Sequence, residues 1–154
     1  MKGFVAVAIF VAALGLLSPG NASATLSLDL GFDPTEICPG NPVQFFFDLE
    51  NVGDQAETVT LSVTFSYEGY EFGPFEGQFP MAAGEEFAKE INLYVPPMAP
   101  PGTLHIAVTA TDSGGSVDDS ADLVILQCGP AFGGNGAKLL IQNTRKAVQE
   151  LGVK

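Results

Sequence analysis

Alternation of apolar and polar residues is the feature of this sequence that most constrains its fold. In the stretch VQFFFDLE, residues 43–50, every second residue is a large apolar one and the intervening residues are mostly polar. Side chains on a β-strand point alternately to its two sides, so this stretch has one buried and one exposed face. Five further stretches show the same period, at residues 26–32, 57–66, 86–96, 103–111 and 117–126. The chain is therefore predicted to be mainly β.

Glycine and proline between these stretches predict how the strands are joined. The DSGGS sequence at 112–116 is typical of a tight turn, and the proline-rich residues 95–102 are predicted to connect strands because proline donates no ladder hydrogen bond. The irregular residues 67–80 predict one or two short edge strands. Lys89 falls on the apolar face of its strand, which predicts a bulge or an exposed strand end. Together these features predict a seven-stranded, antiparallel, immunoglobulin-like (fibronectin type III-like) β-sandwich over residues 25–128.

The N-terminal residues have the layout of a secretory signal peptide. Lys2 precedes an apolar run at residues 4–17, and Ala22-Ser23-Ala24 supplies a small-residue cleavage site. The run is shorter than the roughly 18 residues that a membrane-spanning helix needs. We therefore predict cleavage of residues 1–24, no stable membrane span afterwards, and a secreted location that is either extracellular or periplasmic.

The two cysteines are predicted to form a disulfide between Cys38 and Cys128, because an exported protein meets an oxidising environment. Free thiols are the alternative. A zinc site is disfavoured because two cysteines and one histidine lack clustered ligand spacing. The predicted bond closes a loop of about 90 residues, which would stabilise the fold by roughly 4 to 5 kcal/mol on the chain-entropy model.

The charge distribution disfavours two classes of partner. The formal net charge is −12, and residues 25–128 carry 17 acidic residues against one basic residue, a net −16. Residues 129–154 carry four basic residues against one acidic residue, a net +3. A body this acidic repels nucleic acid and anionic membranes, so neither is expected as a partner.

The C-terminal residues are predicted to form an amphipathic helix at 137–151, after a glycine-rich linker at 129–136. One stripe of that helix is formed by Leu140, Thr144, Ala147, Val148 and Leu151. So short a helix is marginal alone in water and must dock. Docking on its own sandwich, against Val124 and Leu126, is the favoured alternative.

The other alternative is that the helix docks on another protein or on a second copy of this chain. Docking on a second copy would give self-association. The residues predicted to bind a partner are then Phe46, Leu140, Val148 and Leu151. On either alternative the sandwich is predicted to fold without residues 137–154.

The order of turns and strands is similar to that of a known group. PGNPVQFFFDLENVGDQAETVTLSV, AAGEEFAKEINLYVP and PPGTLHIAVTATDSGG resemble the CARDB family (cell-adhesion-related domains of bacteria) and related immunoglobulin-like modules attached to bacterial glycosidases. The resemblance covers roughly residues 26–127, most of a domain of ordinary size. It implies a secreted or surface accessory module with no catalytic motif, and this chain differs in its disulfide and its basic tail.

Residues that could carry chemistry are few. The one histidine, His105, is predicted on the outward face of its strand, and a hydrolase would need it in a cleft beside a serine or a carboxylate. We predict no catalytic residues. Asp112, Asp118 and Asp119 flank a turn and offer oxygen ligands for Ca²⁺, although their spacing does not match an EF-hand. A solvated hairpin tip is the favoured alternative, and no other cofactor is predicted.

Two functional classes follow for this chain. The favoured one is a secreted, non-enzymatic interaction, adhesion or structural accessory module whose partner is a protein or a cell-surface glycan. The alternative is a carbohydrate-binding module that presents surface aromatic rings. The candidate rings are Phe46, Tyr67, Tyr70, Phe72 and Phe75. Exposed, coplanar rings on one face would favour the carbohydrate-binding module, and buried rings would argue against it.

Overall fold

The structure, a computed structural model, describes residues 25–130 and 134–154. The predicted signal peptide and its cleavage site lie outside the described residues. Eight strands and one helix follow one another as β1 (Leu26–Asp33), β2 (Glu36–Ile37), β3 (Pro42–Asn51), β4 (Glu57–Tyr67), β5 (Tyr70–Met81), β6 (Glu86–Tyr94), β7 (Gly102–Thr111), β8 (Ser116–Ile125) and α1 (Gly136–Gln149). In this described part of the chain, no helix has both the length and the apolar character needed to cross a membrane.

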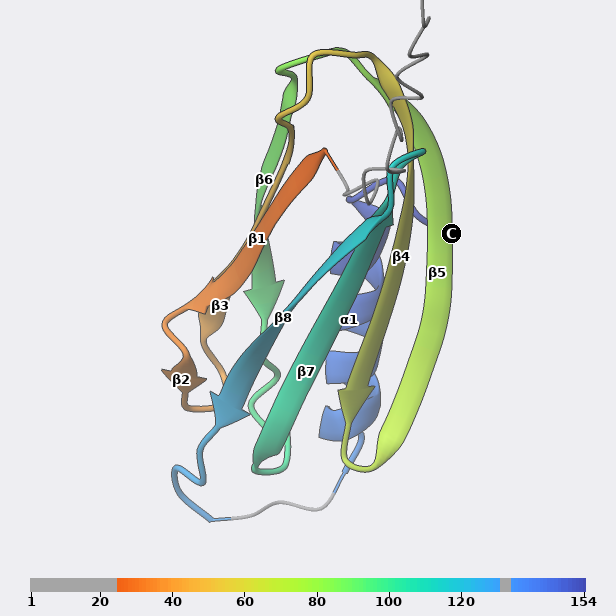
Figure 1. The fold of residues 1–154 in the computed structure, drawn as a ribbon. Coiled ribbons are helices and arrows are strands. Elements are labelled where there is room, and N and C mark those ends of the chain that lie inside the picture. Colours follow the sequence, from red (N-terminus) through yellow and green to blue (C-terminus); the bar gives the residue numbers. More distant parts are fainter. Residues whose placement is uncertain (1–24, 131–133) are drawn as a thin grey trace, which may run out of the picture.

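The strands form a sandwich of two sheets (Figure 1). The smaller sheet has the order β1-β3-β6, and the larger has the order β2-β8-β7-β4-β5. The prediction of seven antiparallel strands is wrong in one respect. The N-terminal segment crosses from the smaller sheet to the larger one at Pro34, and there the two-residue β2 forms an eighth strand that pairs in parallel with β8.

The segment predicted as one or two short edge strands forms a single strand of 12 residues, β5. It pairs with β4 from the Glu57–Met81 pair to the Tyr67–Tyr70 pair. A register shift between Val63 and Phe65 absorbs the irregular residues without breaking the ladder. Pairing along nearly the whole of β4 therefore outweighs the local signals from glycine and proline.

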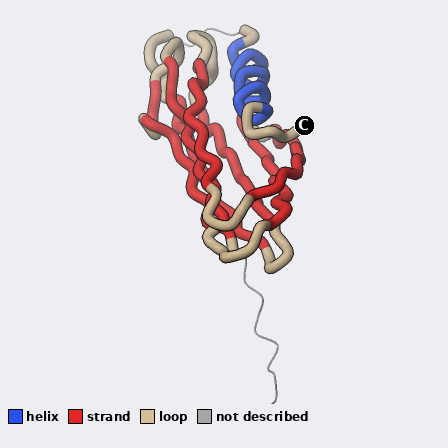
Figure 2. Tube along the Cα trace, turned by 90° about the horizontal axis from the view of Figure 1, so that it is seen from above, coloured by secondary structure: helices blue, strands red, loops and turns tan. Residues whose placement is uncertain are grey.

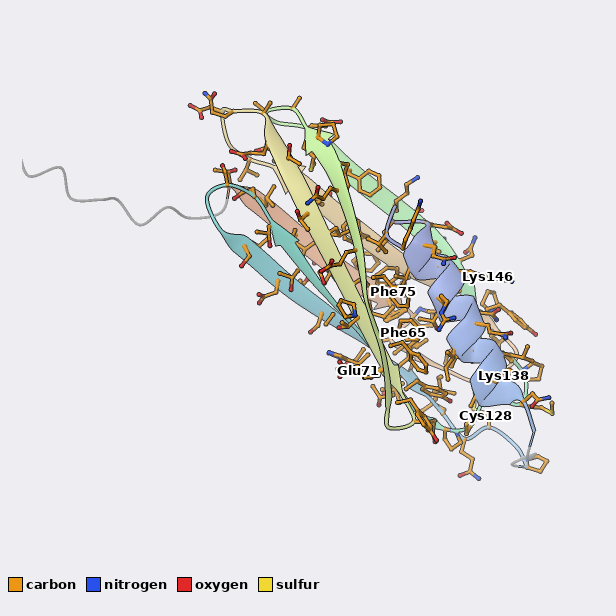
Figure 3. All side chains as sticks on the ribbon, turned by 90° about the vertical axis from the view of Figure 1, so that its right-hand side faces the viewer. Phe65, Glu71, Phe75, Cys128, Lys138 and Lys146 are labelled. Atoms are coloured by element: carbon orange, nitrogen blue, oxygen red, sulfur yellow. A yellow bond between two sulfur atoms is a disulfide. The ribbon has the colours of Figure 1, made fainter. Side chains whose placement is uncertain are left out.

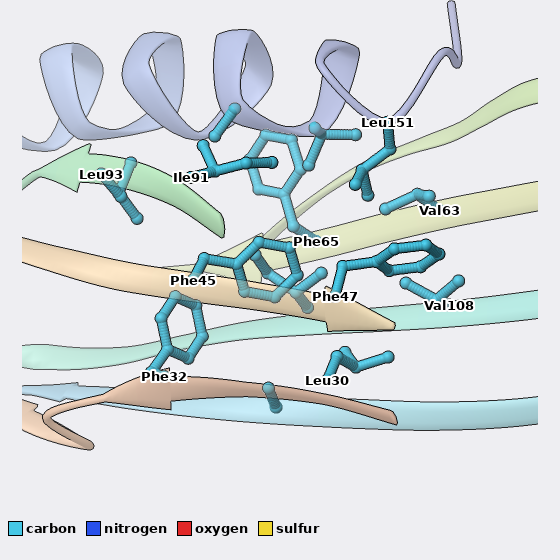
Figure 4. Close-up of a cluster of buried hydrophobic side chains, with 14 of the residues drawn as sticks. Leu30, Phe32, Phe45, Phe47, Val63, Phe65, Ile91, Leu93, Val108 and Leu151 are labelled. Carbon is cyan, nitrogen blue, oxygen red and sulfur yellow. The ribbon is translucent and has the colours of Figure 1, made fainter. Parts of the chain in front are cut away.

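The inward faces that alternation predicts are confirmed. Phe45 and Phe47 of β3 are each 1% exposed, whereas Phe46 between them is 37% exposed. Figure 4 shows Phe45 and Phe47 in the interior, with Phe65 beside Ile91 and Leu151. Of the two alternatives predicted at Lys89, the bulge is wrong, because β3 and β6 pair in continuous register. The exposed strand end fits, because Lys89 lies in the mostly exposed first half of β6, over the ring of Phe87.

Helix α1 docks on its own chain. Figure 1 shows it running beside the gap between β6 and β5, the edge strands of the two sheets, and Figure 2 shows the helix along one side of the strands. It packs against β6 and β4, so the predicted dock on Val124 and Leu126 of the last strand is wrong. The gap between two edge strands exposes core residues, and the apolar stripe of α1 covers them.

The predicted stripe of α1 is confirmed, but its proposed role in binding is wrong. Leu140, Val148 and Leu151 are at most 1% exposed and belong to the core, so they are unavailable to a partner. The same burial argues against a sandwich that folds without residues 137–154. Of the four predicted partner-binding residues, Phe46 alone stays accessible.

The residues after α1 extend the larger sheet. The backbone N–H groups of Glu76 and Lys154 each donate to the other residue's carbonyl over 3.1 Å, which adds the chain end to the edge of β5. Gly77 permits this approach, because a Cβ there would lie 2.4 Å from the carbonyl oxygen of Gly152. Val153 is buried beside this pair.

Two features fix the loops. Cys38 and Cys128 form the predicted disulfide, with Cα atoms 5.6 Å apart, and join the end of β2 to the segment after β8. At the opposite end the buried side chain of Asn51 donates from Nδ2 to the carbonyls of Gln55, Met81 and Ala82 and accepts from the Gly53 N–H. The Asn51 side chain of the ENVGD sequence therefore fixes loop geometry.

Candidate binding face

His105 lies on the outward face of the larger sheet, as predicted, and contacts a carboxylate there. Its Nδ1 lies 2.5 Å from Oδ1 of Asp122, and Ser66 is its neighbour on the other side, in β4. Among the described residues no hydrogen bond joins Ser66 to His105, so the nucleophile and the base of a triad are not connected. His105 and Asp122 are both open to solvent, and His105 borders a shallow hollow of about 350 Å³ that Asp118, Asp119 and Ser120 also line.

The three candidate calcium ligands point in different directions. Asp112 is buried and accepts four hydrogen bonds, from the N–H and hydroxyl of Thr25 and from the N–H groups of Gly114 and Gly115. Burial raises the pKa of the Asp112 carboxyl, but these hydrogen bonds together bring its pKa below the ordinary value. Asp112 thus closes the turn and ties down the start of β1.

The other two carboxylates do not complete a calcium site. Asp119 accepts a hydrogen bond from the Leu30 N–H of β1 over 3.0 Å, whereas Asp118 is exposed on the outer face of β8. Within the residues that the structure describes, no group of three His, Cys, Asp or Glu side chains is arranged to hold a metal ion.

Most of the candidate aromatic rings are packed rather than displayed. Tyr67 is buried, donates its hydroxyl hydrogen to the Pro100 carbonyl, and burial together with the nearby Glu68 charge raises its pKa to about 12. Figure 3 shows Phe65 and Phe75 between β5 and α1, while Glu71 points away from α1. Phe72 and Phe75 stack on Phe65. These rings belong to the core and do not form a platform.

Among the residues that the structure describes, three aromatic rings are exposed. Tyr70 is 67% exposed at the β4–β5 turn. Phe46, which is 37% exposed, and Tyr94, which is 46% exposed, lie on the same outer face of the β1-β3-β6 sheet. Two rings on one face make this sheet the candidate binding face.

The outer face of the β1-β3-β6 sheet is strongly acidic. Cross-strand register places its side chains in rows: Ser27, Glu50 and Glu86; then Asp29, Asp48 and Ala88; then Gly31, Phe46 and Glu90; then Asp33, Gln44 and Asn92; then Pro42 and Tyr94. The outward positions thus hold six carboxylates and no basic residue. Hereafter we call these 14 positions the acidic face.

The ring of Phe46 packs over Gly31, which has no side chain to occupy that space. A Cβ on Gly31 would lie 2.3 Å from Cζ of Phe46 and 2.9 Å from both of its Cε atoms, so the ring lies across the glycine. Beside the ring is a shallow hollow of about 580 Å³, lined by Asp29, Phe46, Phe47, Asp48, Ala88, Lys89 and Glu90. The ring and four charged groups therefore border one accessible depression.

Like charges face each other across the acidic face. Asp29 is opposite Asp48, and Glu50 is opposite Glu86. The Asp48 charge, a hydrogen bond with Asp48, slight burial and the Glu50 charge all raise the pKa of Glu86. One oxygen of Asp48, Oδ1, is buried without a hydrogen-bond partner. Directly opposed like charges destabilise a sheet, so this arrangement lowers the stability of the fold.

The sequence prediction found Phe46 but missed the carboxylates and Tyr94 around it. Alternation placed Asp29, Asp48 and Glu50 on outward faces, but it does not tell which strands are neighbours. The order β1-β3-β6 brings these residues together. Their shared charge sign was visible in the sequence, whereas their shared location was not.

A second hollow, of about 230 Å³, lies near the disulfide. Its lining is Pro39, Pro97, Met98, Ala99, Pro100, Pro101, Leu126, Gln127, Cys128, Gly129 and Pro130. It has no charged side chain, and specific ligand sites combine apolar walls with a few placed polar groups. The acidic face is therefore the stronger candidate.

Comparisons with known proteins do not assign a family. No family model matches the chain, and no curated protein matches it. The resemblance to CARDB modules therefore stays a prediction.

Solved structures show distant likeness. The Pseudomonas fluorescens alkylpurine DNA glycosylase AlkC is 17% identical with a TM-score of 0.49, over 68% of this chain and 31% of that chain. The Bacillus subtilis sporulation control protein Spo0M is 18% identical with a TM-score of 0.43, over 82% of this chain and 56% of that chain. A PapD-like domain of human CEP192 is 12% identical with a TM-score of 0.42, over 82% of this chain and the whole domain. This chain thus spans about a third of AlkC and just over half of Spo0M, and the likeness carries no argument about function.

Proposed function

We propose that this chain is an exported, non-enzymatic, immunoglobulin-like interaction module that binds a partner through its acidic face. The order of the strands supports the immunoglobulin-like assignment, because the first segment contributes to both sheets and the rest form an antiparallel sandwich. The disulfide and the signal-peptide layout support export. The solvent exposure of His105 and the lack of a hydrogen bond to the neighbouring Ser66 among the described residues support a role without catalysis.

One observation carries the proposal: six carboxylates share the outward positions of the sheet with the accessible ring of Phe46, against one base, Lys89, at the border of the hollow beside that ring. A sheet gains nothing in folding from opposed like charges, since they repel each other. A partner with basic groups would relieve that repulsion, and an aromatic ring at the centre would supply apolar contact area. The partner is therefore expected to be basic with at least one apolar side chain.

Site-specific photo-crosslinking tests this proposal. A photoreactive phenylalanine analogue is placed at position 46, and a matched analogue at position 70, where Tyr70 is also exposed but lies at the β4–β5 turn. The proposal expects an adduct from position 46 in the producing cells, weakened by Glu90→Lys and unaffected by Asp118→Lys. Asp118 is an exposed acid on the other sheet. Equal adducts from positions 46 and 70, or none from 46, would contradict a binding role for the acidic face.

Carbohydrate binding is a second candidate, favoured by the way the Phe46 ring lies across Gly31 beside an open hollow. A ring in such a position can stack on a sugar, and the flanking carboxylates can accept its hydroxyl hydrogen bonds. Electrophoresis through gels that contain soluble polysaccharides tests it. Retardation of the wild-type protein that Phe46→Ser abolishes and Tyr70→Ser preserves would support glycan binding. Unchanged mobility in every gel would count against it.

A further inference from the structure

We infer that the partner of the acidic face is the basic outer surface of α1 in a second copy of this chain, an inference that rests on the proposed function. The two surfaces have opposite charge and lie on opposite sides of β6. Reciprocal contact between two copies would therefore form a closed dimer with the same patches on both subunits.

The outer surface of α1 carries unused positive charge. Lys138, Leu139, Gln142 and Lys146 are all exposed, and at 3.6 residues per turn they fall within about 100° of the helix circumference. Residues 136–149 contain three basic residues and no acidic one. Figure 3 labels Lys138 and Lys146 on α1, on the side of the molecule away from Glu71.

These charges are not satisfied within the chain. Arg145 lies 5.9 Å above the ring of Phe75, but no ion pair joins Lys138, Arg145 or Lys146 to a carboxylate of the described residues. The apolar stripe fixes α1 in the gap beside β6, so its outer surface does not lie over the acidic face of its own chain. The positive charges of α1 therefore have no carboxylate partner among the described residues of their own chain. They are available for contact with a second chain.

The spacing of charges matches. Lys138 and Lys146 are eight residues apart, about 12 Å along a helix that rises 1.5 Å per residue. Glu86 and Glu90 are four residues apart on β6, about 13 Å along a strand that rises 3.3 Å per residue. If Lys138 faces Glu90 and Lys146 faces Glu86, Leu139 lies on the same end of the contact as Phe46, because Phe46 and Glu90 are cross-strand neighbours.

The sizes of the two surfaces also match. A helix of 14 residues is about 21 Å long, and the ten residues of β3 span about 33 Å. The helix therefore fits within the length of the acidic face. Leu139, which is 43% exposed, and Phe46 provide an apolar pair at the Lys138–Glu90 end of an otherwise charged contact.

Both surfaces border the same edge strand, which permits reciprocal contact. Asn143 of α1 donates from Nδ2 to the carbonyl of Tyr94 over 3.0 Å, and Tyr94 belongs to the acidic face. A hollow of about 310 Å³ lies at this junction, with Asn92 and Tyr94 on one side and Lys146 and Glu150 on the other. A two-fold axis near β6 would therefore bring each helix onto the other chain's sheet.

Sedimentation velocity on the purified protein tests the inference. At about 50 mM salt we expect a monomer–dimer equilibrium, and at about 500 mM salt a dissociation constant at least tenfold higher, because salt screens exposed charges. Lys138→Glu alone and Glu90→Lys alone should each weaken the dimer about tenfold, because each places like charges opposite each other. The two substitutions together should restore the dimer to about the wild-type affinity.

Matched controls carry the same changes of net charge elsewhere. Lys154→Glu and Asp118→Lys alter charges outside both surfaces and should leave the dissociation constant unchanged. Thermal unfolding of every variant shows that the fold is kept. A protein that stays monomeric at low salt, or a dimer indifferent to Lys138→Glu and Glu90→Lys, would overturn the inference.

The crosslinking experiment separates this failure from failure of the proposed function. An adduct from position 46 with the mass of two chains, and with a crosslinked peptide from α1, supports both. An adduct with a different protein or a glycan overturns the second-copy inference and leaves the proposed function standing. Loss of both the dimer and the adduct overturns both.

Discussion

Replacing Asn51 by aspartate tests how the loops next to the acidic face are held. Asn51→Asp changes one NH₂ group into an oxygen and keeps the shape of the side chain. The side chain is fully buried, and its Nδ2 lies 2.8, 3.1 and 3.3 Å from the carbonyl oxygens of Gln55, Ala82 and Met81. The substitution therefore points a carboxylate oxygen at three carbonyl oxygens.

The expected loss of stability follows from two contributions. The NH₂ group has two hydrogens, and each lost hydrogen bond costs about 1 kcal/mol. Leaving an unpaired charge in a buried site adds enough to make the total about 3 to 5 kcal/mol at neutral pH. A domain of this size is stable by roughly 5 to 15 kcal/mol, so the loss is a large fraction. The melting temperature should fall by roughly 10 to 20 °C.

The loss should depend on pH with a definite sign. The buried site raises the pKa of the substituted carboxyl above its unfolded value of about 3.9, because burial and the three carbonyls disfavour the charged form. When protonated, that carboxyl can again donate a hydrogen bond. The variant should therefore be closest to wild type below about pH 4, and its deficit should grow as pH rises through the folded pKa.

Urea denaturation of both proteins from pH 4 to pH 8 measures the difference. Asn41→Asp is the matched control, because Asn41 is exposed and its Nδ2 donates to only one carbonyl, that of Cys38, over 3.0 Å. It should lose less than about 1 kcal/mol. An Asn51→Asp protein that loses no more than this control, with no dependence on pH, would refute the role assigned to the amide.

Three further predictions concern stability. Replacing Cys38 and Cys128 together by serine should lower the free energy of unfolding by about 4 to 5 kcal/mol, the loop-closure value for a separation of 90 residues. Urea denaturation measures this loss. Two titratable thiols in the wild-type protein without reductant would disprove the bond. Deleting residues 137–154 should leave a chain without cooperative thermal unfolding, because four buried leucine and valine side chains are lost, each worth about 1.5 to 3 kcal/mol. A sharp transition near that of the full chain would contradict this. Above pH 10 the unfolded chain ionises at Tyr67 before the folded one does, so stability on the order of 2 kcal/mol that is present below pH 10 should be lost between pH 10 and 12. Tyr67→Phe should lack this loss, and equal losses in both proteins would assign it elsewhere.

Local sequence determined which residues lie inside. Alternation placed Phe45 and Phe47 in the core and Phe46 outside, and the 3.6-residue period placed Leu140 and Val148 on the buried stripe of α1. Both patterns depend only on how a strand or a helix orients successive side chains, so neither needs knowledge of the neighbours. The disulfide could likewise be predicted, because only two cysteines are present.

Tertiary structure alone decided what these elements meet. The chain order does not reveal that β1, β3 and β6 are neighbours, and that order assembles the acidic face from residues as distant as Asp29 and Glu90. It also does not reveal the gap between β6 and β5. Helix α1 packs over the core residues in that gap and not on β8, where docking was predicted. Strand pairing and helix docking are contacts between residues far apart in sequence, and they are set by how much apolar surface the whole chain can bury at once.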